Sequence, residues 1–191
     1  MIYTIGHSNY TIEKFLELLE RHQITAICDV RSAPYSQYCP HFNREAIKES
    51  LTTHKIEYVY LGDELGARSK DASCIKNGIV HFDLLAQTPL FMSGINRLIK
   101  GSKPFKIALM CAEKNPQECH RTILISKALE ERAQNITHIL EDGFITHADL
   151  IEQLTKAFNQ GQIDSLLMNK IQMRKKTYQM QAHKMGYAMT I

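Results

Sequence analysis

The sequence lacks the segments that would place a chain in a membrane or on the secretory route. Its 191 residues contain no run of about 18 apolar residues, the length that a membrane-spanning helix needs. Residues 1–7 do not combine a basic region with an apolar stretch, so we expect no signal peptide. The five cysteines are odd in number and follow no pairing pattern, which is typical of free thiols in a reducing compartment. We therefore expect a soluble cytoplasmic protein with no membrane partner.

Several common active-site motifs are also missing. Neither a Walker A loop nor the glycine pattern of dinucleotide-binding domains occurs. The phosphatase pattern Cys-x5-Arg is absent, because the residue six places after Cys111 is Gln117. The chain has no internal repeat and no low-complexity segment. These absences exclude the most familiar nucleotide-binding and phosphatase signatures, and we expect no bound cofactor.

The positive charge of the chain is concentrated near its C-terminal end. The formal net charge is +3, and residues 165–191 hold five basic residues and no acidic one. Subtraction (+3 − 5) leaves −2 for the rest of the chain. We predict one α/β domain over residues 1–160 and a basic, helical or extended tail over residues 161–191. The tail can contact a nucleic acid or a partner protein, although it contains no recognisable nucleic-acid-binding motif.

Short apolar segments alternate with amphipathic ones before the tail. The predicted strands span residues 1–5, 25–30, 57–61, 105–110 and 137–140. The first predicted helix carries the apolar stripe Ile12, Phe15, Leu16 and Leu19, and the second begins near Asn43. Two helical stretches within 82–100 are separated by a break near Pro89. The last two predicted helices span about 116–133 and about 147–158. The alternation predicts a mostly parallel sheet of about five strands with helices on both faces, a three-layer α/β fold. Residues 66–77 are expected to form an exposed loop.

Reactive side chains follow every predicted strand. They are His7 and Ser8, then Asp29 and Arg31, then Asp63 and Glu64, then Cys111, Glu113, Cys119, His120 and Arg121, and finally Glu141 and Asp142. In a parallel sheet these positions share one edge, where ligands of such folds bind. Solubility alone does not require reactive residue types there. The sequence therefore predicts an active site at this edge.

The triplet Cys119-His120-Arg121 falls in the first turn or so of the helix that Pro116 is predicted to open. A helix start carries about half a positive charge, which lowers the pKa of a nearby cysteine. Arg121 can hold a phosphate or a carboxylate through two hydrogen bonds. The alternative is that Cys119 packs inward and that Arg121 pairs with a nearby acid.

The remaining candidates also have two interpretations each. Cys111 is a substrate contact or a small buried hydrophobe. Glu113 is an acid, base or electrostatic group, or it forms a salt bridge with Arg31 or Arg121. His7 binds an anion or moves protons, or else it fixes a loop together with Ser8. Arg31 beside Asp29 is a substrate clamp or half of an internal ion pair. We predict catalytic roles for Glu113, His7 and Cys119. Substrate-binding roles are predicted for Arg31, Arg121, Ser8, Asp29, Cys111 and His120.

A metal site is a weaker interpretation of the same residues. Cys111, Cys119 and His120 are ligand types suited to zinc, with His7, Cys39 or His41 as the fourth. However, Cys-x7-Cys-His is not a standard zinc spacing. Adjacent residues such as Cys119 and His120 also point in different directions on a helix. We therefore predict no metal.

Several motifs, in this order along the chain, resemble the family called domain of unknown function 488. They are Thr4-Ile5-Gly6-His7-Ser8, Asp29-Val30-Arg31-Ser32 with Pro34 and Ser36, Pro40-x-Phe42, Glu64-Leu65-Gly66, Met110-Cys111-Ala112-Glu113, Cys119-His120-Arg121, and His138-Ile139 before Asp142-Gly143. The resemblance covers residues 1–155 or so and implies a small α/β protein, with suggested links to nucleotide or nucleic-acid processing. Gln37 and Ala67 depart from the pattern, which often has arginine and glycine there, and Gln37 removes one anion contact.

Three hypotheses follow for the function. The first is an enzyme acting on a small anionic substrate, such as a nucleotide or a nucleic-acid end, by hydrolytic or N-glycosidic cleavage. In it Arg31, Arg121 and the helix start bind the phosphate, Glu113 is the acid or base, and His7 orients Glu113. The second is thiol chemistry at Cys119 or Cys111. The third is a binding module that docks through its basic tail.

Overall fold

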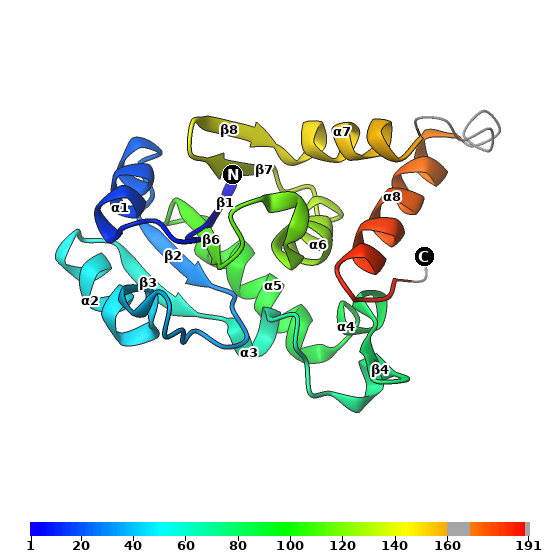
Figure 1. Cartoon of the computed structure of the whole chain (residues 1–191), viewed down its shortest axis with the longest axis horizontal. Coiled ribbons are helices and arrows are strands. Elements are labelled where there is room, and N and C mark those ends of the chain that lie inside the picture. The colour runs from blue at the N-terminus through cyan, green and yellow to red at the C-terminus, as the bar shows by residue number, and fades with distance from the viewer. Residues whose placement is uncertain (160–168, 190–191) are drawn as a thin grey trace.

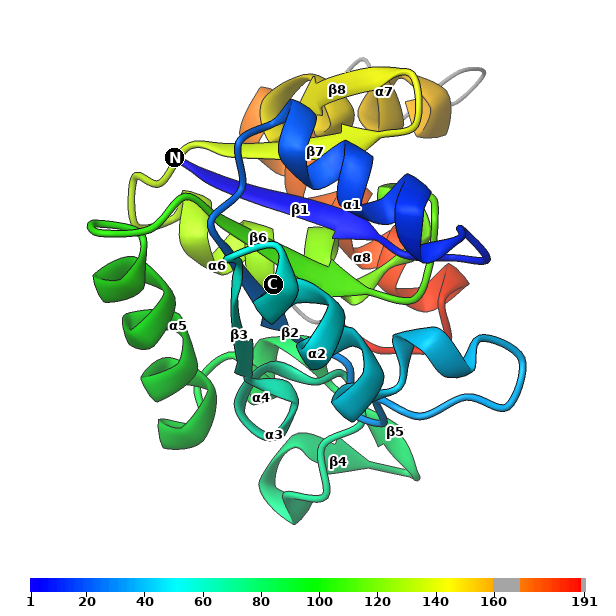
Figure 2. The same ribbon diagram turned by 90° about the vertical axis from the view of Figure 1, so that its left-hand side faces the viewer.

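The chain folds around a six-stranded sheet. The computed structural model describes residues 1–159 and 169–189, and Figure 1 shows their arrangement. The strands are β1 Ile2–Gly6, β2 Ala26–Asp29, β3 Glu57–Tyr60, β6 Ile107–Cys111, β7 Ile136–Leu140 and β8 Gly143–Thr146. They lie in the order β3-β2-β6-β1-β7-β8, and Figure 2 shows β7, β1 and β6 in succession. All neighbours are parallel except β7 and β8. The predicted α/β class is confirmed.

Two segments differ from the sequence-based prediction. Strand β8 was not predicted, because it is only four residues long and follows the turn at Asp142-Gly143 directly. The expected loop over residues 66–77 is ordered at its end, where Ile75–Lys76 (β4) pairs with Ile79–Val80 (β5). Cys74 beside this hairpin is fully buried. A buried side chain therefore anchors a segment whose small and charged residues indicate exposure.

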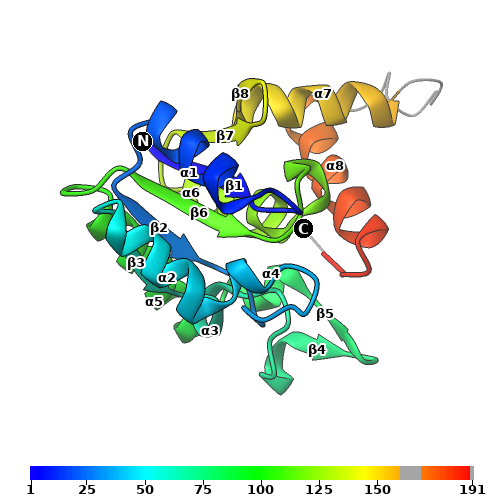
Figure 3. The same cartoon turned by 60° about the vertical axis from the view of Figure 1, so that its left-hand side comes forward.

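Helices cover both faces of the sheet, as predicted (Figure 3). The helices are α1 Ile12–Arg21, α2 Arg44–Thr53, α3 Gly62–Leu65, α4 Phe82–Leu85, α5 Pro89–Gly101, α6 Lys127–Glu130, α7 His147–Asn159 and α8 Lys170–Lys184. Helices α1 and α2 bury Phe15, Leu19 and Ile47 in one core cluster. Helices α5 to α8 contribute to the other cluster. Two separate apolar layers therefore sandwich the sheet, which is the arrangement that two-faced parallel sheets require.

Helix starts follow the sequence signals at two places. The Thr11 hydroxyl accepts a hydrogen bond from the backbone N–H of Lys14 at 3.2 Å, which caps α1. Thr88 caps α5 in the same way, and Pro89 occupies the first helical position, where its missing N–H costs nothing. The predicted break near Pro89 is confirmed.

The helix predicted over residues 116–133 is wrong as a continuous element. Pro116–Glu118 forms one 3-10 turn, after which Cys119 is extended, with φ −130° and ψ 140°. A π-helical segment, Arg121–Ser126, then leads into α6. The pair Asn115-Pro116 can begin either a single turn or a long helix, so the sequence does not reveal the interruption. The extended residue changes the direction in which the Cys119 side chain points.

The basic C-terminal segment is helical over Lys170–Lys184. Asn169 and Gln172 form a reciprocal capping box at its start. Thr177, Tyr178, Gln181 and Ala182 are buried against the body. Beyond the helix, Tyr187 stacks on Phe82 with ring centroids 4.2 Å apart. The boundary predicted near residue 160 lies outside the described residues. In the described part of the chain, no helix combines the length and the hydropathy that a membrane crossing requires.

A chain of buried polar side chains joins the centre of the sheet to α8. The hydroxyl of Thr4 lies 2.8 Å from Nδ1 of His138, and Nε2 of His138 lies 3.1 Å from Nδ1 of His147. Nε2 of His147 lies 2.9 Å from the Tyr178 hydroxyl. Burial and the nearby Arg174 guanidinium lower the pKa of His147 to about 3. Burial, followed by the neighbouring His147 and Arg121, also lowers the pKa of His138. Both imidazoles are therefore neutral at neutral pH.

These histidines should make the fold acid-sensitive. An unfolded histidine titrates near pH 6.5, whereas folded His147 resists protonation until about pH 3, so stability falls as the pH drops through that window. As the pH falls from about 7 to about 5, protonation of His147 in the unfolded chain should alone lower the free energy of unfolding by about 2 kcal/mol. Urea titrations of the wild type and of His147→Gln at both pH values measure this. The variant should be less stable at pH 7 and should lose less stability on acidification.

The matched control is His54→Gln, which alters an exposed histidine at the C-cap of α2. It should keep the wild-type loss of stability between the two pH values. If His147→Gln lost as much stability on acidification as the wild type, the buried histidine pair would not be the source of the acid sensitivity.

Candidate functional site

The topology creates a crevice between the carboxyl ends of β2 and β6. The two strands are neighbours, but the helices that follow them pack on opposite faces of the sheet. The chain therefore leaves the strands in opposite directions, which is the situation that forms ligand sites in open α/β sheets. A pocket of about 270 Å³ lies here. Its lining includes Arg31, Ser32, Arg68, Glu113, His120 and Tyr187.

Four side chains converge beside this pocket. Glu113 Oε2 lies 2.8 Å from Sγ of Cys111 and 3.1 Å from Sγ of Cys119, and each thiol can donate a hydrogen bond to it. Nδ1 of His120 lies 3.7 Å from the first sulfur and 3.8 Å from the second. One ligand atom from each of the four residues falls within 4.8 Å of every other. We call these residues, Cys111, Glu113, Cys119 and His120, the Cys-Glu-Cys-His cluster.

The interrupted helix explains why the cluster forms. On a regular helix, Cys119 and His120 would point about 100° apart. Because Cys119 is extended instead, its sulfur and the His120 ring both face the end of β6. The argument from helix geometry against a shared site for these two residues is therefore wrong. The fourth member is Glu113, whereas the thiol of Cys39 and the imidazole of His41 bind the carbonyls of Ser8 and Tyr10.

Backbone contacts hold the loop after β6 in place. The ladder between β1 and β6 continues past both strands, because His7 N–H donates to the Cys111 carbonyl at 2.9 Å and Ser8 N–H donates to the Ala112 carbonyl at 2.8 Å. Gly6 lies so close to this loop that a Cβ atom there would be 1.8 Å from the Glu113 carbonyl oxygen. Only glycine allows that approach.

Arg121 holds the same loop from the other side. Its side chain is fully buried, and it donates to the carbonyls of Glu113 at 2.6 Å and Lys114 at 3.0 Å. Its Nε has no hydrogen-bond partner among the described residues. Neither Glu113 nor another described acid forms a salt bridge with it. Arg121 therefore supports the loop through its backbone and places a buried positive charge next to the cluster.

The ionisation of the cluster is coupled. Burial opposes the ionisation of Cys119, but the hydrogen bond from Cys111 and the charges of Arg121 and His120 outweigh it and lower its pKa. The hydrogen bond with Cys119 and burial raise the pKa of Cys111. Burial and the neighbouring Cys119 raise the pKa of Glu113. Burial opposes protonation of His120, yet Cys119 raises its pKa. Within this pair, ionisation is therefore easier at Cys119 than at Cys111.

Arg31 lines the pocket and is held rigidly from behind. Its Nε and Nη2 donate to the two carboxylate oxygens of buried Asp29 at 2.9 and 2.6 Å. Nη2 also donates to the Phe42 carbonyl, and Nη1 contacts Nε2 of His7 at 3.1 Å. The Tyr58 hydroxyl donates to the same carboxylate at 2.7 Å. These contacts use four of the five N–H donors of a guanidinium, which leaves one for a ligand.

His7 and Ser8 lie behind the pocket rather than in its wall. The His7 ring stacks on Phe42 at 4.3 Å, and Nδ1 lies 2.9 Å from the Ser8 carbonyl. Burial and the charge of Arg31 lower the pKa of His7 to about 4, so the ring is neutral and positions Arg31. The Ser8 hydroxyl donates to the Asn9 side chain at 3.3 Å. Neither residue lines the pocket.

The structure brings in residues to which the sequence analysis assigned no role. Ser32 accepts a hydrogen bond from the backbone N–H of Arg68, and both residues line the pocket. Tyr187 lines it from the C-terminal segment. A second pocket of about 370 Å³ shares Glu113, His120 and Tyr187 with the first and adds Gln181 and Lys184. Arg68 lies two residues after the Glu64-Leu65-Gly66 motif, whereas no local signal points to Tyr187.

Comparison with models of known protein families gives a match. The model of the family described as "Domain of unknown function DUF488" matches residues 11–128, which include β6 and the whole Cys-Glu-Cys-His cluster. No significant match was found among curated proteins or among solved structures.

Replacing Gly6 should disturb the site and the fold together. In Gly6→Ala the new methyl group would overlap the Glu113 carbonyl and push the loop away from β1, so we expect a loss of about 3 kcal/mol in the free energy of unfolding. Urea unfolding measures this. The control Gly101→Ala adds a methyl group 3.1 Å from the flexible end of Ile107, and its effect should stay within about 0.5 kcal/mol. Similar losses in the two variants would contradict the close approach at Gly6.

Proposed function

This chain belongs to the DUF488 family, and we propose that it is an enzyme that acts on a phosphorylated or otherwise anionic substrate. The reaction class that we propose is hydrolytic processing of a nucleotide or a nucleic-acid end. One observation carries the proposal: two arginines and a group able to transfer protons line the same pocket. Arg31 and Arg68 supply the cations, and Glu113 supplies the carboxyl group.

Arg31 is suited to bind an anion because its position is fixed before a ligand arrives. Its two bonds to Asp29 hold the guanidinium plane, and the neutral His7 ring fixes one edge. The remaining donor meets the substrate without loss of side-chain entropy on binding. Arg68 is exposed and adds a second cation to the pocket lining. Arg121 binds the loop carbonyls, so its contribution to an anion is long-range attraction.

Glu113 is suited to acid or base catalysis by its environment. Its pKa is raised by burial and by Cys119, which brings proton exchange closer to neutral pH. The carboxyl group is fixed by the two thiols, and its loop is fixed by Arg121. His120 also lines the pocket and can orient a substrate group or a water molecule.

The second pocket makes room for a substrate longer than a free phosphate. It joins the first at Glu113, His120 and Tyr187, and Lys184 of the basic C-terminal segment lines it. A nucleotide or the end of a nucleic acid has both the length and the charge for the two pockets together. The basic C-terminal segment would then form part of the substrate site.

Thiol chemistry is the second candidate, because Cys111 and Cys119 meet at one carboxylate oxygen. The lowered pKa of Cys119 favours a nucleophilic thiolate. If this chemistry dominates, iodoacetamide should alkylate Cys119 rapidly below neutral pH, at a rate that Cys119→Ser abolishes. Uniformly slow labelling of all five cysteines would exclude it.

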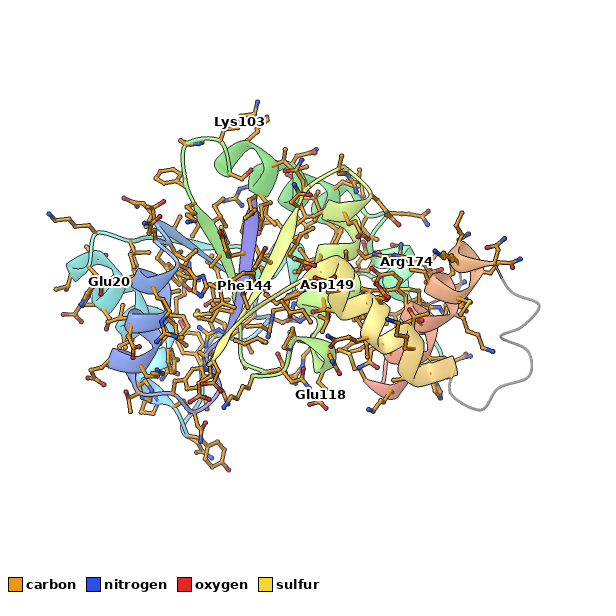
Figure 4. All side chains as sticks on the ribbon, turned by 90° about the horizontal axis from the view of Figure 1, so that it is seen from above. Glu20, Lys103, Glu118, Phe144, Asp149 and Arg174 are labelled. Carbon is orange, nitrogen blue, oxygen red and sulfur yellow. The ribbon has the colours of Figure 1, made fainter. Side chains whose placement is uncertain are left out.

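Anion binding should depend on Arg68. We expect Arg68→Ala to weaken the binding of a nucleoside monophosphate about tenfold, because a pocket cation is lost. The control is Lys103→Ala, which removes one positive charge at the opposite end of the molecule from Glu118 (Figure 4). It should leave the affinity within about twofold. Isothermal titration with both variants tests this. Equal weakening in the two would show that net charge, rather than the pocket, attracts the anion.

Turnover should depend on Glu113. A screen of nucleoside mono-, di- and triphosphates and of 5′-phosphorylated oligonucleotides should find a hydrolysed substrate, and Glu113→Gln should reduce kcat by about 100-fold or more. The Gln side chain keeps the size of Glu113 and loses its proton exchange. If the wild type neither binds nor hydrolyses any of these compounds, the proposed function is wrong.

A further inference from the structure

We propose that Cys111, Cys119 and His120 bind one divalent transition-metal ion of the zinc class, and that Glu113 stands beside its open fourth position. The inference goes beyond the proposed function, because it rests on ligand geometry and does not depend on which substrate is used. Nothing in the family description assigns a metal to this chain.

The ligand set is one that zinc uses in enzymes. Two cysteine sulfurs and one histidine nitrogen form a three-ligand site that leaves one position for water or substrate. Hard ions such as Mg²⁺ and Ca²⁺ prefer oxygen, so the two sulfurs exclude them. Two thiolates also cancel the charge of a divalent ion, which removes most of the cost of burying it. Cys111 and Cys119 are 3% and 1% exposed, so the cost would otherwise be large.

The distances between the ligand atoms agree with a tetrahedral ion. Zn–S bonds of about 2.3 Å and Zn–N bonds of about 2.05 Å, at the tetrahedral angle, place S and N about 3.6 Å apart. Nδ1 of His120 lies 3.7 Å from Sγ of Cys111 and 3.8 Å from Sγ of Cys119. The imidazole nitrogen already lies at nearly the bound distance from each sulfur, and the two sulfurs lie within 4.8 Å of each other.

The surroundings of His120 prepare Nδ1 as a ligand. Its other nitrogen, Nε2, lies 3.2 Å from the Val30 carbonyl and is therefore the natural carrier of the proton. A backbone acceptor of this kind fixes both the tautomer and the ring orientation of metal-binding histidines. The backbone N–H of Arg121 points at Sγ of Cys119 at 3.5 Å, a contact that stabilises a thiolate.

Glu113 is too close to the sulfurs to be a ligand where it stands. Its Oε2 lies 2.8 and 3.1 Å from them, whereas an oxygen and a sulfur bound to one tetrahedral zinc ion, at about 2.1 and 2.3 Å, lie about 3.6 Å apart. A metal would push the carboxylate toward the pocket that Glu113 lines. Cys111, Glu113 and His120 all line that pocket, so the open position faces it. A water molecule there would be activated by the ion and could pass its proton to Glu113.

The test measures metal on the full-length chain. The protein is purified under reducing, anaerobic conditions and stripped of metal with a chelator. It is then dialysed against Zn²⁺ at a low free concentration, and the bound zinc is determined by mass spectrometry. We expect one equivalent per chain. Co²⁺ in its place should give the intense near-ultraviolet absorption of sulfur–cobalt bonds and the visible bands of a tetrahedral ion.

Matched substitutions identify the ligands. Cys111→Ser, Cys119→Ser and His120→Asn should each weaken Zn²⁺ binding by about 100-fold or more, because each removes one ligand. Cys39→Ser and Cys74→Ser make the same chemical change outside the cluster and should keep one equivalent. Glu113→Gln should also keep one equivalent, since Glu113 is not a ligand in this site.

Several outcomes would overturn the proposal. The first is that the wild type binds less than a tenth of an equivalent of zinc. The second is that its cobalt spectrum lacks sulfur-to-metal absorption. Both are measured on the wild type, so neither depends on the folding of a variant. Loss of the metal in Glu113→Gln would overturn the open fourth position. Zinc binding without turnover of any phosphorylated compound would refute the proposed function and leave the metal site standing. Turnover by metal-free protein would support the proposed function and show that the reaction does not require the ion.

Discussion

A buried guanidinium under the loop after β6 is the constraint on which the rest of this site depends. Arg121 has no exposed surface, and it holds two successive carbonyls of that loop. The loop in turn carries Glu113, and it can reach this position only because Gly6 leaves space for the Glu113 carbonyl. A charge that is expensive to bury thus donates to two backbone carbonyls and forms no salt bridge with a described acid. The same charge that shapes the loop also favours thiolates in the cluster.

Much of the framework was predictable because it depends on local patterns. Apolar runs of strand length between amphipathic stretches gave the parallel sheet, and the end of each run marked the edge at which Arg31, Cys111 and Glu113 gather. Thr11 and Thr88 began helices for the usual capping reason. These features follow from residues within a few positions of one another.

The rest depends on contacts between residues far apart in the chain. The extended backbone of Cys119 brings two sulfurs and an imidazole together, yet nothing near Asn115-Pro116 distinguishes one turn from a long helix. Tyr187 reaches the pocket because its ring stacks on Phe82, more than a hundred residues earlier. The pairing of Arg31 with Asp29 was one of two interpretations, and only the position of Tyr58 and His7 shows how the guanidinium is held. Side-chain direction and distant packing are the information that a single sequence does not carry.

The C-terminal segment has a consequence for how the protein is made. Ala188 pairs through its backbone with the chain at Val80 and Phe82, and Tyr187 closes one side of the pocket. Residues 169–189 leave the ribosome after every other part of the pocket wall. A nascent chain can therefore fold its sheet and bring its sulfurs together while that side stays open to solvent. Maturation of the site would then have two stages, an accessible one during synthesis and a sheltered one after release.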